Sequence, residues 1–303
     1  MPIASVTRHD AVSYVVSREF TIDFRRVEGL DAVVALSMAS EGVGAALYLL
    51  SSWVATTAGM LAGLALVALG VFTLFFHLGH PLKFWRVVAR SKSAWISRGA
   101  AATSAFLAFG VLALIFQEHR FLDIPFHTLA FLGGMAILLY SGLILSSMRA
   151  VPFWNNPVIP VAFLFQSFAS ASLICMLVLL LDSDRDSARM DVVPVAAGLM
   201  LLVSALVLAL VKSVPRSGAA GRAMASLLRG SLRRHFVLGW LVLGILVPFI
   251  VVVIYSVTVP SHKTLALVAT VVGVVSRCIG DVSFRHSLIK AGLHEPLVEQ
   301  DER

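Results

Sequence analysis

Eight apolar runs, each close to 20 residues long, restrict the folds that this sequence can adopt. A helix needs about 20 apolar residues to cross the hydrocarbon core of a bilayer. Continuous runs of this kind bond their own backbone as helices, whereas the strands of a membrane barrel would alternate apolar and polar residues. We therefore predict an all-α integral membrane protein with about eight transmembrane helices. The predicted spans are residues 30–52, 57–77, 99–117, 126–147, 158–181, 192–211, 236–257 and 264–286.

The composition agrees with this class. Hydrophobic residues make up 58% of the 303 residues and charged residues 14%, and the mean hydropathy is +0.90. Soluble domains carry about a quarter charged residues. The predicted organisation has three parts. They are a polar N-terminal segment, 1–29, with an interfacial helix near 12–24, a membrane domain, 30–290, and a C-terminal tail, 291–303.

The basic residues predict an orientation, because Lys and Arg accumulate in the cytoplasmic loops of membrane proteins. If the eight spans alternate, all but four of the 24 Lys and Arg residues fall on one side; Arg277 and Arg285, in the C-terminal segment, are counted there. Both termini are therefore predicted to be cytoplasmic. The net charge of +7 is then explained by this bias and by attraction to anionic lipid, without a nucleic-acid partner. The four residues on the other side are Arg120, Arg185, Arg189 and Lys263.

Redox cofactors on this chain are disfavoured by its ligand types. The two cysteines, Cys175 and Cys278, belong to different spans and form no CxxC motif, so no iron–sulfur cluster is expected. A haem between helices would need two histidines deep inside spans, and no predicted span carries a central one. The sequence also lacks a GxxxxGK[ST] loop, which disfavours an ATP-driven pump.

Three polar residues inside or beside the apolar runs are candidates for a functional site. Glu41 lies midway along the first span, His77 ends the second, and Tyr140 lies inside the fourth. Polar groups are costly in hydrocarbon and are therefore usually functional or paired. For each of the three a structural role stays open: a hydrogen bond between helices for Glu41 and Tyr140, and an interfacial position for His77.

Three motifs resemble a known family. They are "HLGHPLKFWRVV…SAWISRG" after the second span, "YSGLILSSMRAVPFWNNPVIPVAFLFQSFASA" across the fourth and fifth spans, and "SRCIGDVSFRHSLIKAG" at the last span. Together they resemble the NrfD/polysulfide reductase membrane-subunit family, which includes the dimethyl sulfoxide reductase anchor. The first two agree in order, spacing and position relative to the spans, and His80 departs from the commoner Arg or Ser of the first motif.

The resemblance implies a fold of two four-helix bundles and a quinone pocket in the first. It implies a membrane anchor that exchanges electrons between a membrane quinone and an iron–sulfur partner subunit. The quinone would be menaquinone or ubiquinone. A catalytic subunit, a molybdoenzyme or similar, would complete a respiratory complex in a prokaryotic cytoplasmic membrane. By the same resemblance His77 matches a histidine tied to the menaquinol reaction, Tyr140 matches a quinone-bonding tyrosine, and Glu41 occupies a polar position of the first span. Quinol oxidation releases two protons, so His77 could accept a proton and Glu41 could relay one.

The basic loop at 78–98 has two interpretations. Its five Lys and Arg residues either only orient the chain or help to dock an extrinsic subunit beside the pocket. Arg86 and Arg98 are the candidates for quinone contacts, because they lie within the family-like stretch. Two other functions stay open: an ion-coupled secondary transporter that uses Glu41, and a quinone-free anchor that conducts protons or docks partners. No inverted repeat supports the transporter.

Overall fold

The computed structural model describes residues 26–27, 30–77, 95–182, 186–258 and 262–294. Within these ranges the chain is helical, and eight helices are long and apolar enough to cross a membrane. The prediction of an all-α membrane protein with eight spans is confirmed. The helices are α2 (Ala32–Trp53), α3 (Thr57–His77), α5 (Trp95–Ile115), α6 (Arg120–Ser146), α7 (Val158–Leu181), α8 (Asp186–Ser213), α9 (Gly218–Leu228), η2 (Arg234–Leu246), α10 (Val247–Thr258) and α11 (Lys263–Lys290).

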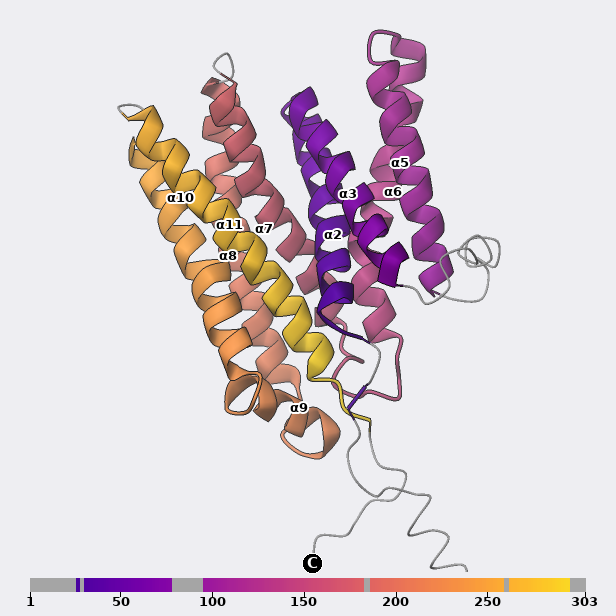
Figure 1. The fold of residues 1–303 in the computed structure, drawn as a ribbon, viewed down its shortest axis with the longest axis vertical. Coiled ribbons are helices and arrows are strands. Elements are labelled where there is room, and N and C mark those ends of the chain that lie inside the picture. The colour runs from indigo at the N-terminus through magenta and orange to yellow at the C-terminus, as the bar shows by residue number, and fades with distance from the viewer. Residues whose placement is uncertain (1–25, 28–29, 78–94, 183–185, 259–261, 295–303) are drawn as a thin grey trace, which may run out of the picture.

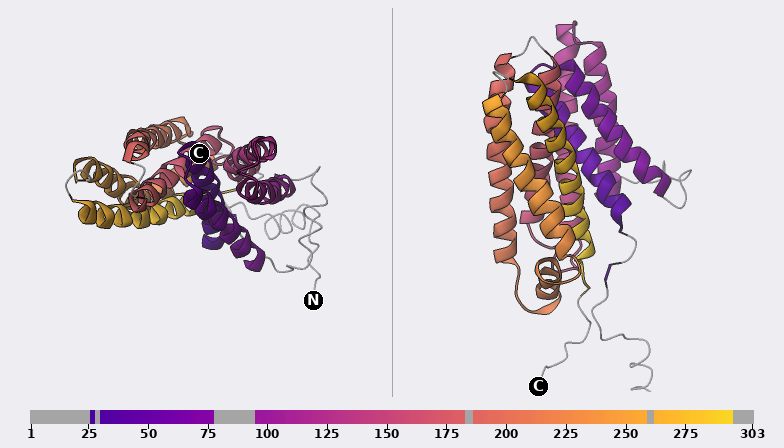
Figure 2. Two further views of the ribbon diagram at one scale, coloured as in Figure 1. Left: turned by 90° about the horizontal axis from the view of Figure 1, so that it is seen from above. Right: turned by 60° about the vertical axis from the view of Figure 1, so that its left-hand side comes forward.

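The spanning helices form two neighbouring bundles (Figures 1 and 2). The first contains α2, α3, α5 and α6, and the second contains α7, α8, α11 and the continuous span of η2 and α10. Helix α2 joins them, because it contacts α3 and α6 in its own bundle and α7 and α11 in the other. In its apolar window 83% of the residues are buried, against 28–56% in the other seven spans. The first span is therefore the centre of the molecule.

Glycines allow α2 and α3 to approach closely. A Cβ atom on Gly44 would lie 2.6 Å from the carbonyl oxygen of Gly63, and one on Gly63 would lie 2.7 Å from the carbonyl oxygen of Gly44. Such contacts suit membrane helices, whose association depends on close packing. Asp31 caps the start of α2, since its carboxylate accepts from the backbone N–H groups of Val33 and Val34.

The helices differ from the predicted ranges in several places. Helices α6 and α8 begin about six residues earlier than predicted, because polar first turns extend both helices before the apolar run starts. The connection predicted at 212–235 contains a short helix, α9. The seventh span starts as the π-helix η2, a wider coil than the apolar run indicates. The interfacial helix expected at 12–24 lies outside the described residues.

The two ends of the membrane domain lie together. The backbone N–H of Val27 donates to the carbonyl oxygen of Gly292 at 3.2 Å, beside a bridge between Arg26 and Leu293. The start of α2 and the end of α11 are thus on the same side of the bundles, as an even number of spans requires. That this side is cytoplasmic remains a prediction from charge.

Candidate functional site

Glu41 is a buried carboxyl group in the middle of the most buried helix. Its residue is only 3% exposed. The Ser37 hydroxyl lies one turn before it, 3.1 Å from Glu41 Oε1 and 2.9 Å from the carbonyl oxygen of Gly70. A hydroxyl has one proton, so Ser37 donates to one of these oxygens at a time. The hydroxyl-bearing side chains of Tyr140 on α6 and Thr103 on α5 line the same cavity as the carboxyl group. Glu41 is therefore hydrogen-bonded by Ser37 and shares its cavity with two further hydroxyl groups from other helices.

Two glycines make room for these side chains. A Cβ on Gly70 of α3 would lie 2.7 Å from Glu41 Cγ, and a Cβ on Gly99 of α5 would lie 2.2 Å from Tyr140 Cε2. Real Cβ atoms do not approach other atoms so closely. The position of the Glu41 carboxyl and the Tyr140 ring thus depends on helix surfaces that lack side chains.

A cavity of about 70 Å³ lies beside Glu41, between the four helices of the first bundle. A volume of this size has room for several water molecules. Its polar groups come from Glu41, Tyr140, Thr103 and Ser104, and Ser104 is exposed at the rim on α5. The cavity therefore combines proton-exchanging groups with an apolar wall. The remaining lining residues are Val71, Leu74, Ala100 and Leu107.

The other predicted site residues are His77, Arg86 and Arg98, and the described part of the structure does not place them in the lining of the Glu41 cavity. His77 is the last residue of α3, three positions after Leu74 of the cavity wall, and its side chain lies outside the described part of the structure. Arg86 lies in the segment 78–94, which is also outside it. Arg98 is exposed in the first turn of α5 and its guanidinium lies 5.0 Å from the ring centroid of Trp95. Glu41 and Tyr140 are thus brought together, whereas Arg98 is not part of the cavity lining.

A second buried polar cluster, on α11, was missed by the sequence interpretation. Arg277, Asp281 and Arg285 follow each other at four-residue intervals and are all 0% exposed. Side chains at this spacing share one helix face. The R-x3-D-x3-R pattern inside an apolar run was a signal of this cluster. Counting Arg277 and Arg285 among the topology-setting charges was wrong, because both face the interior of the protein.

Arg277 and Arg285 bond to different surroundings. Arg277 donates to Ser170 Oγ at 3.1 Å, to the carbonyl oxygen of Gln166 at 3.1 Å and to that of Gly244 in η2. Arg285 forms an ion pair with Asp281 at 3.1 Å and donates to Ser167 Oγ at 2.7 Å. Buried charges are tolerated in membranes when they are paired and hydrogen-bonded in this way.

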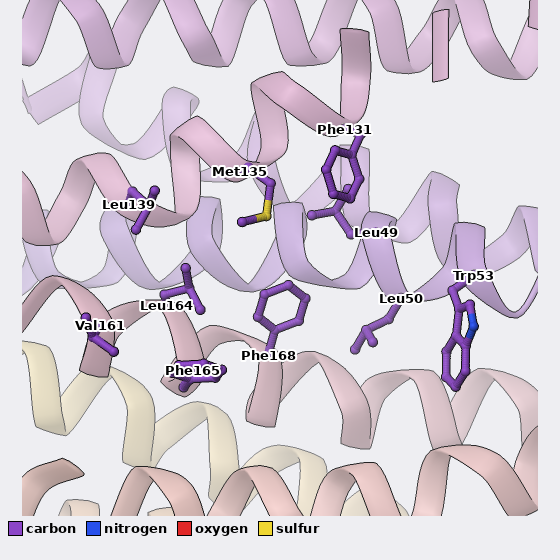
Figure 3. Close-up of a pocket in the computed structure, with 10 residues that line it drawn as sticks. All are labelled: Leu49, Leu50, Trp53, Phe131, Met135, Leu139, Val161, Leu164, Phe165 and Phe168. Carbon is purple, nitrogen blue, oxygen red and sulfur yellow. The ribbon is translucent and has the colours of Figure 1, made fainter. Parts of the chain in front are cut away.

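A separate apolar groove of about 500 Å³ lies between α2, α6 and α7 (Figure 3). It shares no residue with the Glu41 cavity. Its wall is hydrocarbon, with one methionine sulfur and the Trp53 indole at one end, so it suits lipid chains and not polar groups. The lining residues are Leu49, Leu50, Trp53, Phe131, Met135, Leu139, Val161, Leu164, Phe165 and Phe168.

The comparison with protein families identifies the chain. The family model described as "Polysulphide reductase, NrfD" matches residues 32–293, which is the whole eight-helix domain. The chain belongs to the NrfD family. Members of the NrfD family are membrane subunits of respiratory oxidoreductase complexes, and the resemblance predicted from the sequence motifs is confirmed.

Two curated relatives are similar to this NrfD-family chain. Protein NrfD of Escherichia coli (strain K12) is 27% identical over 224 residues, which cover 63% of this chain and 70% of the relative. A sulfite dehydrogenase subunit of Allochromatium vinosum is 26% identical over 130 residues, which cover 38% of this chain and 40% of the relative. The match to the second relative therefore spans less than half of either protein.

Proposed function

We propose that this NrfD-family chain is a quinone-reactive membrane subunit that exchanges electrons with a partner subunit. The observation that supports this most is the meeting of Glu41 and Tyr140 at one cavity inside the first bundle. A carboxyl group and a phenol at a cavity that reaches the lipid-facing side of α5 suit a substrate that is dissolved in the membrane and exchanges protons.

The chemistry of a quinol matches these groups. Oxidation of a quinol to a quinone releases two protons and two electrons, so a base is needed near the quinol oxygens. Glu41 would accept a proton from one hydroxyl, and Tyr140 would hold an oxygen by a hydrogen bond. His77, at the end of α3, would be a second proton acceptor, since imidazole titrates near neutral pH. In quinone reduction the same groups would return the protons.

The electrons would pass to or from a separate subunit. The two cysteines of the sequence lie on different helices and are free thiols, which gives no ligand set for a cluster. We propose an iron–sulfur electron-transfer subunit as the direct partner, with a catalytic subunit behind it. One relative is named as a subunit of a sulfite dehydrogenase, which supports a multisubunit enzyme. We propose a prokaryotic cytoplasmic membrane as the location of this complex.

Binding of a quinol analogue tests the proposal. A hydroxyquinoline N-oxide is titrated into the purified native complex, and quenching of its fluorescence is followed. We expect saturation near one site per chain. His77→Ala and Tyr140→Phe should each weaken binding about tenfold, since one hydrogen bond to a charged or polar partner contributes about 1.5 kcal/mol.

Tyr48→Phe is the matched control. Tyr48 is a buried phenol of the same bundle, two turns from Glu41 on α2, and it does not line the cavity. This variant should bind the analogue like the native protein. Absence of saturable binding in the intact native complex would overturn the proposal, as would equal weakening by Tyr48→Phe and Tyr140→Phe.

A further inference from the structure

Arg285 extends from the last helix, α11, to the border of the first bundle. The residue is fully buried, and its Nη1 donates to Ser141 Oγ of α6 at 3.5 Å. Its Nη2 donates to Ser167 Oγ and to the carbonyl oxygen of Phe163, both on α7. The guanidinium also lies 4.6 Å from the centre of the Phe163 ring. One side chain thus connects three helices from both bundles.

The contacts of Arg285 lie next to Glu41 and Tyr140, the two predicted site residues of the cavity. Ser141 directly follows Tyr140 in α6, and Gly42 directly follows Glu41 in α2. A Cβ atom on Gly42 would lie 3.2 Å from Arg285 Nη2 and 2.5 Å from Ser167 Oγ. Because Gly42 has no side chain, the guanidinium of Arg285 can approach the backbone of α2 directly after Glu41.

Arg285 carries a positive charge to the α2 surface beside Glu41. Helices α2 and α11 are in contact, and the Nη2 atom of Arg285 faces Gly42, the residue that follows Glu41. From the other helices around the carboxyl group, Tyr140 of α6 and Thr103 of α5 contribute neutral hydroxyls. Asp281 is paired with Arg285 on the side of its Nε, away from the Nη groups that reach α6 and α7. Opposite charges attract strongly where water is excluded.

We propose that Arg285 is a positioning residue for the Glu41 cavity: its fixed positive charge, supplied by the second bundle, stabilises the Glu41 carboxylate that accepts a proton from the substrate. This inference rests on the proposed quinol function. The cavity in the first bundle would then depend on a charge from α11 for its function. A purely structural tether would hold the helices together without changing the pH dependence of turnover.

The test compares quinol oxidation against pH in the native complex and in two variants. Arg285→Gln combined with Asp281→Asn removes both charges and avoids a buried unpaired carboxylate, which would itself be destabilising. The acid limb of its pH–rate profile should move to higher pH by less than about one unit, because the loss of the Arg285 charge is partly offset by the loss of the Asp281 charge. Arg285→Lys keeps the charge and should keep the native pH profile at a reduced rate.

Arg277→Lys and, separately, Arg277→Gln are the matched controls. Arg277 is equally buried on the same helix, two turns away, and bonds to α7 and η2. These variants should leave the position of the acid limb unchanged. If the double variant does not assemble, Gly42→Ala serves instead. Its Cβ would lie 2.5 Å from Ser167 Oγ and 3.2 Å from Arg285 Nη2, and would therefore disturb the hydrogen bond between these two groups. A smaller shift in the same direction is expected.

The outcomes separate the two proposals. Saturable analogue binding by the native complex supports the quinol function independently of Arg285. If binding is present and the acid limb stays in place in both the double variant and Gly42→Ala, the role of Arg285 is overturned and the function stands. If the native complex binds no analogue, the function is overturned and the role of Arg285 falls with it.

Discussion

At the scale of single residues, the position of Glu41 explains why a carboxyl group is tolerated inside an apolar helix. Hydroxyl groups of Ser37, Thr103 and Tyr140 surround it, and the cavity supplies space for water. An unpaired carboxylate in hydrocarbon would be costly, and these partners offset much of that free energy. The same partners leave the carboxyl group free to gain and lose a proton beside the cavity.

Glu41→Gln should separate proton transfer from binding. The amide keeps the size and most hydrogen bonds of the carboxyl group but cannot accept a proton, so kcat for quinol oxidation should fall about 100-fold or more. The Kd of the quinol analogue should change less than about threefold. Glu118→Gln, at an exposed position between α5 and α6, is the control and should behave as native. Equal losses in rate and binding would instead assign Glu41 a structural role.

Gly99→Ala should block the cavity without unfolding the protein. The new Cβ would lie 2.2 Å from Tyr140 Cε2 and must displace the phenol ring. We expect analogue binding to weaken at least about tenfold while the helical content stays native. Gly198→Ala is the matched control, since a Cβ there meets nothing within 4 Å. Native binding by Gly99→Ala would show that Tyr140 does not shape the binding site.

At the scale of elements, the contact between α2 and α3 depends on small residues rather than on apolar area. Both helices are apolar around most of their surface, and lipid chains satisfy such surfaces as well as another helix does. Close backbone approach at Gly44 and Gly63 therefore selects this pairing. It also sets the distance between Glu41 and the wall that Val71 and Leu74 contribute.

Gly63→Ala should destabilise this helix pair. Its Cβ would meet the Gly44 carbonyl oxygen and the Tyr48 backbone at 2.7 Å, and backbone atoms cannot move aside as a flexible side chain can. Overpacking of this kind costs about 1–3 kcal/mol. Thermal unfolding in detergent should show a lower Tm than in the native protein and in Gly198→Ala. An unchanged Tm would mean that α2 and α3 separate without loss of stability.

At the scale of the whole molecule, the connection between the two bundles is fixed by Trp154. This residue lies in the segment between α6 and α7, is fully buried, and donates its indole N–H to the carbonyl oxygen of Leu288 in α11 at 2.8 Å. A Cβ on Gly292 would lie 2.3 Å from its ring. The segment that joins the bundles is thus attached to the end of the last helix, which also carries Arg285.

Trp154→Phe should loosen the end of α11. The substitution removes the hydrogen bond and leaves the Leu288 carbonyl buried without its donor, which costs about 1–3 kcal/mol. Hydrogen exchange of the last turns of α11 should become faster, and the Tm in detergent should fall. Trp53→Phe, at a residue that is 61% exposed, should leave both unchanged. Native exchange in Trp154→Phe would show that other contacts hold α11.

The sequence alone determined the eight spans and the polar residues worth testing. A transmembrane helix can be predicted from about 20 apolar residues without knowledge of its neighbours. This length crosses the hydrocarbon core, and the backbone groups of the helix hydrogen-bond within it. Glu41 and Tyr140 were found because polar groups inside apolar runs stand out. Arg277 and Arg285 were misassigned, because charge counting does not reveal which face of a helix is buried.

Only the tertiary structure decided which of these groups meet. Apolar periodicity does not select neighbours in a membrane, since lipid and protein surfaces are equally apolar. Close approach at single glycines brings Glu41 next to Tyr140, 99 positions later, and folding back of the last helix brings Arg285 to the same region. These are contacts between atoms far apart in the chain, and they are formed by packing, which no local pattern in the sequence contains.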